Sequence, residues 1–236
     1  MIFSQHQGQG YYYHGSAVDP YLSNVVFLVN GVGTTGATIR DSLGHSLSVF
    51  GNTSIVRTDS DFPDGGISMD GTGDYIQTSQ SASEFVFPGD FTLELDYKAF
   101  ASQVSLYPCP FSLYNAYAAN GGMSIFDRHS STPTKLTVAV NGSYPTPQSS
   151  STAVDNTLYR IMFSRSGSTM RLFINGILEG SSTFSGTVQQ VGGLWLGTAG
   201  DTITSYKGIL GRIRVTKGIA RATANYTPTT RPYPTY

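Results

Sequence analysis

Hydrophobic and polar residues alternate in short segments along most of this chain, a pattern typical of β-strands with one buried face. The clearest case is segment 91–98, where Phe91, Leu93, Leu95 and Tyr97 project to one side and the polar residues to the other. Further short apolar or alternating segments lie at 25–29, 46–50, 135–140, 159–165, 170–175, 194–196 and 209–215. No window sustains helical spacing over three turns. The pattern therefore predicts many strands and no long helix.

Turn residues separate these segments. Residues 166–169 (Ser-Gly-Ser-Thr) predict a hairpin between 159–165 and 170–175, and Asn175-Gly176 predicts a second tight turn. Residues 31–36 match a dinucleotide-binding G-x-G-x-x-G pattern, but 37–44 is expected to be a short strand and a turn. The helix that would hold a pyrophosphate is missing, so we interpret 31–36 as a loop. The chain is predicted to be all-β, an antiparallel two-sheet sandwich.

Residues 1–20 differ from the rest because they are rich in Gln and Gly and show no sustained periodicity. We expect an N-terminal arm over 1–20 and one sandwich over 21–236 that ends in an extended Pro-rich tail. Such an arm buries little by itself, whereas tyrosine supplies contact area when a partner is present. Tyr11, Tyr12 and Tyr13 are therefore predicted assembly contacts on a neighbouring subunit. The tail, 228–236, either docks in the same way or folds back over its own sandwich.

The charge balance narrows the choice of partners. Lys and Arg number 14 and Asp and Glu 15, so the net charge is -1 and charged residues make up 12% of the chain, about half the usual share. A net charge this close to zero produces no positive electrostatic field that would attract nucleic acid or an anionic membrane. We therefore expect no nucleic-acid partner and no membrane insertion, and the longest apolar run, 25–29, is far too short for a membrane span.

Cysteine and leader signals add two expectations. Cys109 is the only cysteine, so no intrachain disulfide is available, and we interpret it as a small buried thiol. The first residues lack the basic and apolar regions of a signal peptide, so we expect synthesis in a cytoplasm.

Two acidic residues are the strongest catalytic candidates. Some sandwich glycosidases carry three carboxylates at alternate positions of one strand, so that nucleophile and acid flank the sugar. Here Glu94 and Asp96 share a face, but Lys98 follows on that face in place of a third carboxylate. We therefore expect no catalytic site and interpret these residues as the polar outer face of a strand.

Other candidates are loop residues. The four histidines, His6, His14, His45 and His129, are isolated in the sequence and interpreted as surface or loop residues without a metal. Four tyrosines in loop-like settings are candidates for stacking on sugar rings: Tyr107, Tyr114, Tyr117 and Tyr144. Core or interface packing is the alternative for these tyrosines.

Four segments, in the right order, resemble motifs of laminin-G-like, concanavalin A-type jelly-roll domains found in bacteriophage virion proteins. Segment 68–76 resembles their D-G-x-G-D-Y turn, and 89–95 resembles their G-D-F-T-I-E strand. Segment 165–176 resembles a hairpin ending in N-G, and 208–221 is similar to G-x-I-D-E-I-R-I-T-K-G-V-A-R. The resemblance covers about residues 21–236 and implies a concanavalin A-like sandwich.

The chain departs from these motifs at particular residues. Gly211 and Arg212 replace an Asp-Glu pair, Ala222 replaces an aromatic residue, and the usual tryptophan before the R-S-G hairpin is replaced around 158–159. Where the family Asp supports calcium, this chain has lost it. Asp41 is left as a weak candidate ligand. We therefore expect no cofactor, and we expect calcium to be either absent or weakly bound.

The resemblance implies a function. It indicates a non-enzymatic virion structural protein, either a capsid decoration or a tail-associated subunit, whose partners are other virion subunits and which forms a homo-oligomer. The alternative is a carbohydrate-binding module that recognises a host-surface glycan from the same particle. A glycoside hydrolase is the remote alternative. The expected location is the virion.

Overall fold

The computed structural model describes residues 19–78, 83–101, 103, 105, 107–113, 122–127, 134–142, 147–188, 193–200 and 204–235. These residues form fourteen strands and two 3-10 turns, η1 (Leu22–Asn24) and η2 (Ser83–Phe85), so the all-β prediction is confirmed. In these ranges no helix has the length and apolar character that a membrane span requires.

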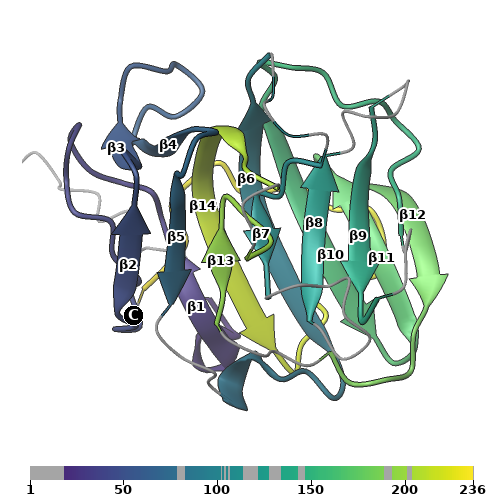
Figure 1. Ribbon diagram of the computed structural model, residues 1–236. Helices are drawn as coiled ribbons and strands as arrows, with labels where there is room; N and C mark the ends of the chain where they lie inside the picture. The colour runs from purple at the N-terminus through teal and green to yellow at the C-terminus, as the bar shows by residue number, and fades with distance from the viewer. Residues whose placement is uncertain are drawn as a thin grey trace, which may run out of the picture.

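Two antiparallel sheets pack face to face as a jelly-roll sandwich (Figure 1). The eight-stranded sheet contains β1 (Val25–Val29), β3 (Ser54–Val56), β4 (Gly66–Asp70), β6 (Phe91–Ala99), β10 (Tyr159–Ser166), β11 (Thr169–Ile174), β12 (Ile177–Thr183) and β14 (Lys207–Lys217). Its order is β12-β11-β10-β6-β14-β4-β3, with β1 also paired to β14. The six-stranded sheet contains β2 (Leu47–Phe50), β5 (Tyr75–Thr78), β7 (Phe111–Ser112), β8 (Met123–Asp127), β9 (Leu136–Val140) and β13 (Trp195–Leu196). Its order is β2-β5-β13-β7-β8-β9.

The alternating pattern of β6 divides it into a core face and an outer face. Leu93, Leu95 and Tyr97 are fully buried in the core between the sheets, as predicted. The Tyr97 side chain reaches across this core, and its hydroxyl donates a hydrogen bond to Asp127 of β8. Burial, reinforced by the Asp127 charge, raises the pKa of Tyr97 well above its ordinary value. A buried polar contact therefore joins the two sheets.

Both predicted turns of the β10-β11-β12 region form. Asn175 and Gly176 have φ of 51° and 84°, the left-handed conformation at both central residues that a two-residue hairpin turn requires. A side chain at Gly176 would also collide with the Tyr226 carbonyl, because a Cβ there would lie 2.0 Å from that oxygen. Residues 31–36 form turns with no following helix, as predicted, whereas the strand expected within 37–44 is not formed.

The D-G-x-G-D-Y segment is a turn that is fixed by one carboxylate. Asp74 is 2% exposed and accepts hydrogen bonds from the backbone N–H of Asn52 and of Asp70, each at 2.7 Å. The side chain therefore joins the β2-β3 turn to the β4-β5 turn. This role explains the motif by local structure alone.

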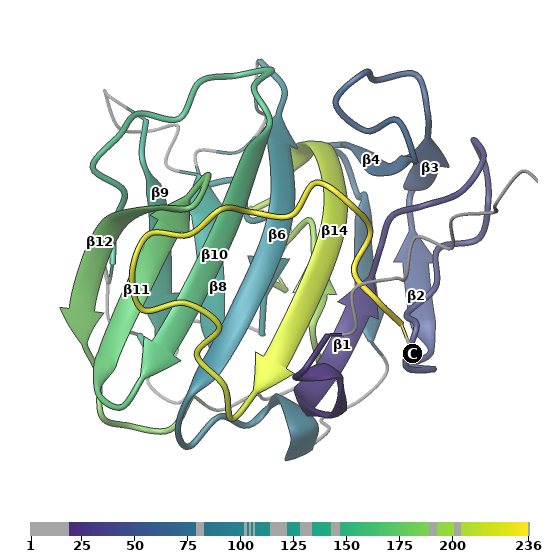
Figure 2. The same cartoon turned by 180° about the vertical axis from the view of Figure 1, so that it is seen from behind.

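The segment 218–235, called here the C-terminal strap, crosses the outer face of the eight-stranded sheet and returns over it (Figure 2). Ser164 donates to the Ala222 carbonyl at 2.9 Å, Tyr226 N–H to the Gly176 carbonyl at 2.9 Å, and Tyr233 N–H to Asn30 Oδ1 at 2.8 Å. Of the two alternatives for the tail, the structure shows the second. The tail folds back over its own sandwich, where it covers a face.

Candidate functional site

The carboxylates of β6 lie on its outer face, as predicted, but they are buried there. Glu94 and Asp96 are each 6% exposed because the C-terminal strap covers the face from which they project. Buried carboxylates need charged or hydrogen-bonding partners. The partners come from β14, which lies beside β6 in the sheet.

Glu94 is paired with the arginine directly opposite it on β14. Arg214 donates to Glu94 from Nε at 2.6 Å and from Nη2 at 2.8 Å, a two-point contact that orients both side chains. The third guanidinium nitrogen of Arg214 donates to Asp19 at 2.8 Å, and Arg221 also binds Asp19. Asp19, at the start of the described chain, is thus held on the same outer face.

Asp96 is paired with Arg212 through an irregularity in β14. The ladder shifts between Leu210 and Ile213, so that Gly211 and Arg212 together stand opposite Asp96. This bulge turns the Arg212 side chain outward, where Nε and Nη2 lie 2.6 and 3.0 Å from the Asp96 oxygens. Arg212, which stands where the motif that this segment resembles has an acidic residue, therefore supplies the counter-charge for Asp96.

Lys98, the third outward charge on β6, is also paired. Its Nζ lies 2.8 Å from an oxygen of Asp59 and 2.8 Å from an oxygen of Asp61. A glycosidic acid-nucleophile pair needs carboxylates that face a sugar. Here each carboxylate is bound by a guanidinium group beneath the strap, so the arrangement stabilises a packed face.

Asp41, the candidate metal ligand, is occupied by hydrogen bonds. Its Oδ1 accepts from Leu28 N–H at 2.7 Å, and its Oδ2 accepts from the N–H groups of Leu43 and His45 at 3.1 Å. The described residues contain no group of three or more His, Cys, Asp or Glu side chains placed to hold a metal ion. Asp41 is therefore the anchor of a turn in this structure.

His45 is a half-buried loop residue, and it contacts two carboxylates that its sequence neighbourhood did not indicate. Its Nδ1 lies 2.6 Å from Asp41 Oδ2 and its Nε2 lies 2.5 Å from Glu84 Oε1. Burial lowers the pKa of His45, but the hydrogen bonds with Glu84 and Asp41 outweigh it and raise the pKa overall. The ring joins the loop before β2 to η2. Glu84 is 39 residues away in the sequence, so no local motif could reveal this pair.

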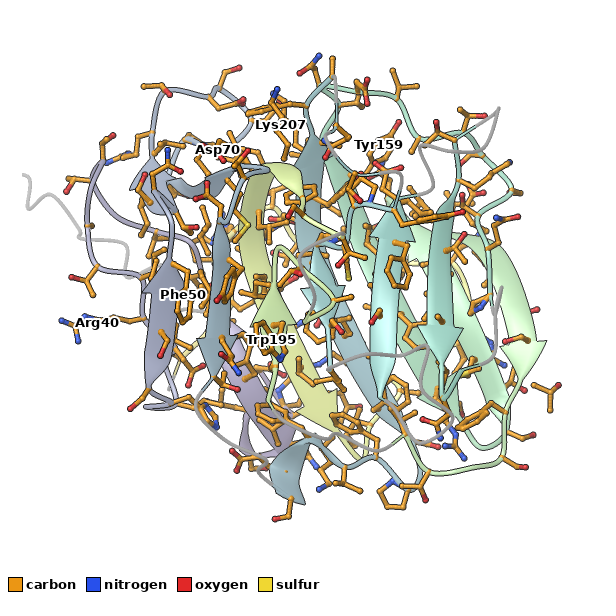
Figure 3. All side chains as sticks on the ribbon, viewed as in Figure 1. Arg40, Phe50, Asp70, Tyr159, Trp195 and Lys207 are labelled. Atoms are coloured by element: carbon orange, nitrogen blue, oxygen red, sulfur yellow. The ribbon has the colours of Figure 1, made fainter. Side chains whose placement is uncertain are left out.

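An aromatic row, defined as Phe50, Tyr75 and Trp195, crosses the outer side of β2, β5 and β13. Figure 3 labels the two ends of this row, Phe50 and Trp195. The Phe50 and Tyr75 rings are stacked with centroids 4.2 Å apart and planes at 16°, and the Tyr75 and Trp195 centroids are 5.4 Å apart. Phe50 is directly opposite Tyr75 in the ladder and is 37% exposed. This row is a candidate surface for a ligand or a partner.

Sequence reasoning missed the aromatic row. Phe50, Tyr75 and Trp195 meet only through the β2-β5 and β5-β13 registers, which join segments far apart in the chain. The one local signal is that Tyr75 and Trp195 begin short strands whose next residues, Ile76 and Leu196, are buried in the core.

Of the four predicted loop tyrosines, the structure describes Tyr107. Tyr107 is half-buried and packs against a small cluster on the outer side of β8 and β9 that includes Phe126 and Ala139. The other candidates lie outside the described residues, namely Tyr11, Tyr12, Tyr13, Tyr114, Tyr117, Tyr144, His6, His14 and His129. Cys109 is fully buried and its Sγ lies 3.2 Å from the Phe111 carbonyl, which confirms the interpretation as a structural thiol.

Comparison with known proteins identifies the family to which this chain is similar. The family model described as the concanavalin A-like lectin/glucanases superfamily matches residues 70–222. No curated protein matches the sequence.

Solved structures show the same fold at low identity. Domain 4 of an extracellular arabinanase from Geobacillus stearothermophilus, solved with arabinotriose, is 15% identical with a TM-score of 0.55, over 76% of this chain and 87% of that one. The receptor-binding domain of botulinum neurotoxin type G is 12% identical with a TM-score of 0.55, over 85% and 49%. A Trypanosoma rangeli sialidase is 12% identical with a TM-score of 0.57, over 82% and 30%. This chain therefore spans about half of the neurotoxin domain and less than a third of the sialidase.

Proposed function

This chain belongs to the concanavalin A-like lectin/glucanases superfamily, and from that premise we propose that it is a non-enzymatic, lectin-like structural subunit of a phage virion. The observation that carries the proposal is the pairing of Glu94 with Arg214 and of Asp96 with Arg212 beneath the C-terminal strap. A strand that displays carboxylates toward substrate in a hydrolase is here closed by the chain's own tail. The likeness of segment 208–221 to phage structural proteins supports a location on the virion, as a capsid decoration or tail-associated subunit.

The catalytic part of the proposal is tested by reducing-sugar release. The full chain is incubated with a panel of neutral and acidic polysaccharides, beside a matched Glu94→Gln variant. We expect no release from either protein. Release by the natural chain that Glu94→Gln abolishes would overturn the non-enzymatic assignment.

The structural part is tested on intact particles. Antibodies raised against the sandwich are expected to bind purified virions at regular positions, which electron microscopy would show. Mass spectrometry of the same particles is expected to detect this chain. Its absence from purified particles would contradict the proposed location.

Glycan binding is the second candidate function, and the aromatic row favours it. On the outer side of β2, β5 and β13, the described side chains Ser48, Phe50, Tyr75, Gln77 and Trp195 include no acidic or basic group. Such a surface suits neutral sugars. Two of the neighbouring structures are of carbohydrate-related proteins, the arabinanase domain solved with arabinotriose and the sialidase.

A glycan array with the natural chain, a Phe50→Ser variant and an Ile177→Ser control separates the two functions. Ile177 is 52% exposed and lies on β12, at the other sheet's edge. Binding that Phe50→Ser removes and Ile177→Ser leaves unchanged would establish a lectin function for the row. Absence of binding would leave the structural role as the sole function of this surface.

A further inference from the structure

The aromatic row ends at an open sheet edge. β2 is the terminal strand of the six-stranded sheet, and among the described residues β5 is the one strand paired with it. An edge strand presents unpaired backbone N–H and C=O groups, which pair readily with another extended chain.

This edge lacks the devices that normally block such pairing. Natural proteins protect exposed edges with lysine, proline, inward charges or bulges. The sequence of β2 is Leu-Ser-Val-Phe, without a charge or proline, and its ladder with β5 is regular over all four residues. Val49 is 43% exposed and Phe50 is 37% exposed. The edge is therefore apolar, regular and accessible on this chain.

The stacking of the row shows what would extend it. The Phe50 and Tyr75 rings lie almost parallel, so each covers one face of the other, and the remaining face of Phe50 is directed toward the free edge of β2. An aromatic side chain on an added strand would take the next position in the stack, because directly opposite residues of neighbouring strands lie side by side.

We infer that the free edge of β2 receives the tyrosine segment of the N-terminal arm from a second copy of this chain, as an added strand. Residues 1–18 contain no Lys, Arg, Asp or Glu, which matches an edge without charges. Tyrosine has high strand propensity, and alternate residues of a strand face opposite sides. Tyr11 and Tyr13 therefore share one face and Tyr12 takes the other.

Three consecutive tyrosines fit the two sides of this edge. One side of β2 presents Phe50 at the end of the aromatic row, and the other presents Leu47 and Val49. A strand with tyrosine on both faces covers both apolar sides at once. Among the described residues no strand pairs with this side of β2. In the proposed assembly a second copy supplies the arm that fills it, and repetition of this contact joins successive copies.

The inference rests on the proposed structural role, and a mixed-disulfide experiment tests it without virions. One variant carries Tyr12→Cys and the other Ser48→Cys, both in the full chain, where the natural Cys109 is fully buried. The two proteins are mixed, oxidised and run on a non-reducing gel. We expect a heterodimer of Tyr12→Cys with Ser48→Cys that greatly exceeds either homodimer.

A charge at the edge provides the matched control. Val49→Lys is expected to lower the yield of mixed disulfide at least about tenfold, since an edge lysine blocks strand addition. Val154→Lys introduces the same charge at a 57% exposed valine in a loop and should leave the yield unchanged. Melting temperatures of both variants verify that each remains folded.

The outcomes are separable from those of the proposed function. A double variant that forms only an intrachain disulfide, or a mixture that forms no heterodimer, would overturn the docking of the arm on a neighbour. Absence of the chain from virions would overturn the location and leave the strand addition measured on purified protein intact.

Discussion

The Tyr233 ring lies over the guanidinium group of Arg214, with the guanidinium carbon 3.9 Å from the ring centroid. The guanidinium carbon of Arg212 lies 5.1 Å from the same centroid. One aromatic ring therefore covers both arginines that pair with the carboxylates of β6. Burial, together with the charges of Glu94 and Asp96, raises the pKa of Tyr233 well above its ordinary value. The strap is thus both the roof of the ion pairs and a partner in them.

Replacement of Tyr233 by alanine is expected to lower the free energy of unfolding by about 2–4 kcal/mol, because it removes a buried ring and its cation–π contacts. Tyr233→Phe keeps the ring and should stay within about 0.5 kcal/mol of the natural chain. Chemical denaturation measures both. An alanine variant as stable as the phenylalanine variant would show that the strap contributes little to the fold.

Gly211→Ala is expected to destabilise the protein by roughly 1–3 kcal/mol, the usual effect of overpacking a core. A Cβ at this position would lie 2.8 Å from Asp96 Cβ and 2.8 Å from a Phe62 ring carbon, closer than packed atoms allow. Gly89→Ala is the control, since a Cβ there meets nothing within 4 Å. Equal melting temperatures for the two variants would contradict a tight bulge at Gly211.

The fold is predictable from the sequence because period-two alternation reports directly on a buried face. Alternation alone assigns Phe91, Leu93, Leu95 and Tyr97 to the core, and all four are buried there. The Asn175-Gly176 turn is equally predictable because its conformation depends on two adjacent residues.

The surfaces could not be predicted in the same way. The alternation places Glu94 and Asp96 on the outer face, but their burial depends on a strap that begins more than 120 residues later. The pairing of Arg212 with Asp96 depends on a bulge, and the aromatic row depends on strand register. Local sequence contains none of this long-range information, and the loop tyrosines that it favours include Tyr107, which packs against a buried cluster.

Calcium is expected to leave the melting temperature unchanged within about 1 °C, compared with a chelator. A site filled at 100 times its Kd would add about 2.7 kcal/mol and raise the melting temperature by several degrees. Asp41, the candidate ligand, already accepts three backbone hydrogen bonds and contacts His45. A rise of several degrees with calcium that the chelator reverses would reveal a site outside the described residues or a rearranged Asp41 turn.

The stability of this protein is expected to fall as the pH rises above neutrality, through His45. Protonated His45 is held between Asp41 and Glu84, and although burial lowers its pKa, the hydrogen bonds with these carboxylates raise it overall. A group whose pKa is higher in the folded than in the unfolded chain binds protons more tightly when folded. Its contribution is fully present below the unfolded value, about 6.5, and is lost as the pH rises through the folded value.

A His45→Gln variant measures this contribution because glutamine keeps hydrogen-bonding capacity but does not titrate. Thermal unfolding of both proteins is followed from pH 5 to pH 9. The difference in melting temperature between the natural chain and His45→Gln is expected to be largest at pH 5 and to shrink as the pH passes the folded pKa. Glu84→Gln, which removes the more exposed of the two carboxylates, should reduce the same difference in part. A difference that is constant with pH would mean that His45 is neutral throughout and acts only as a hydrogen-bonded spacer between the loop before β2 and η2.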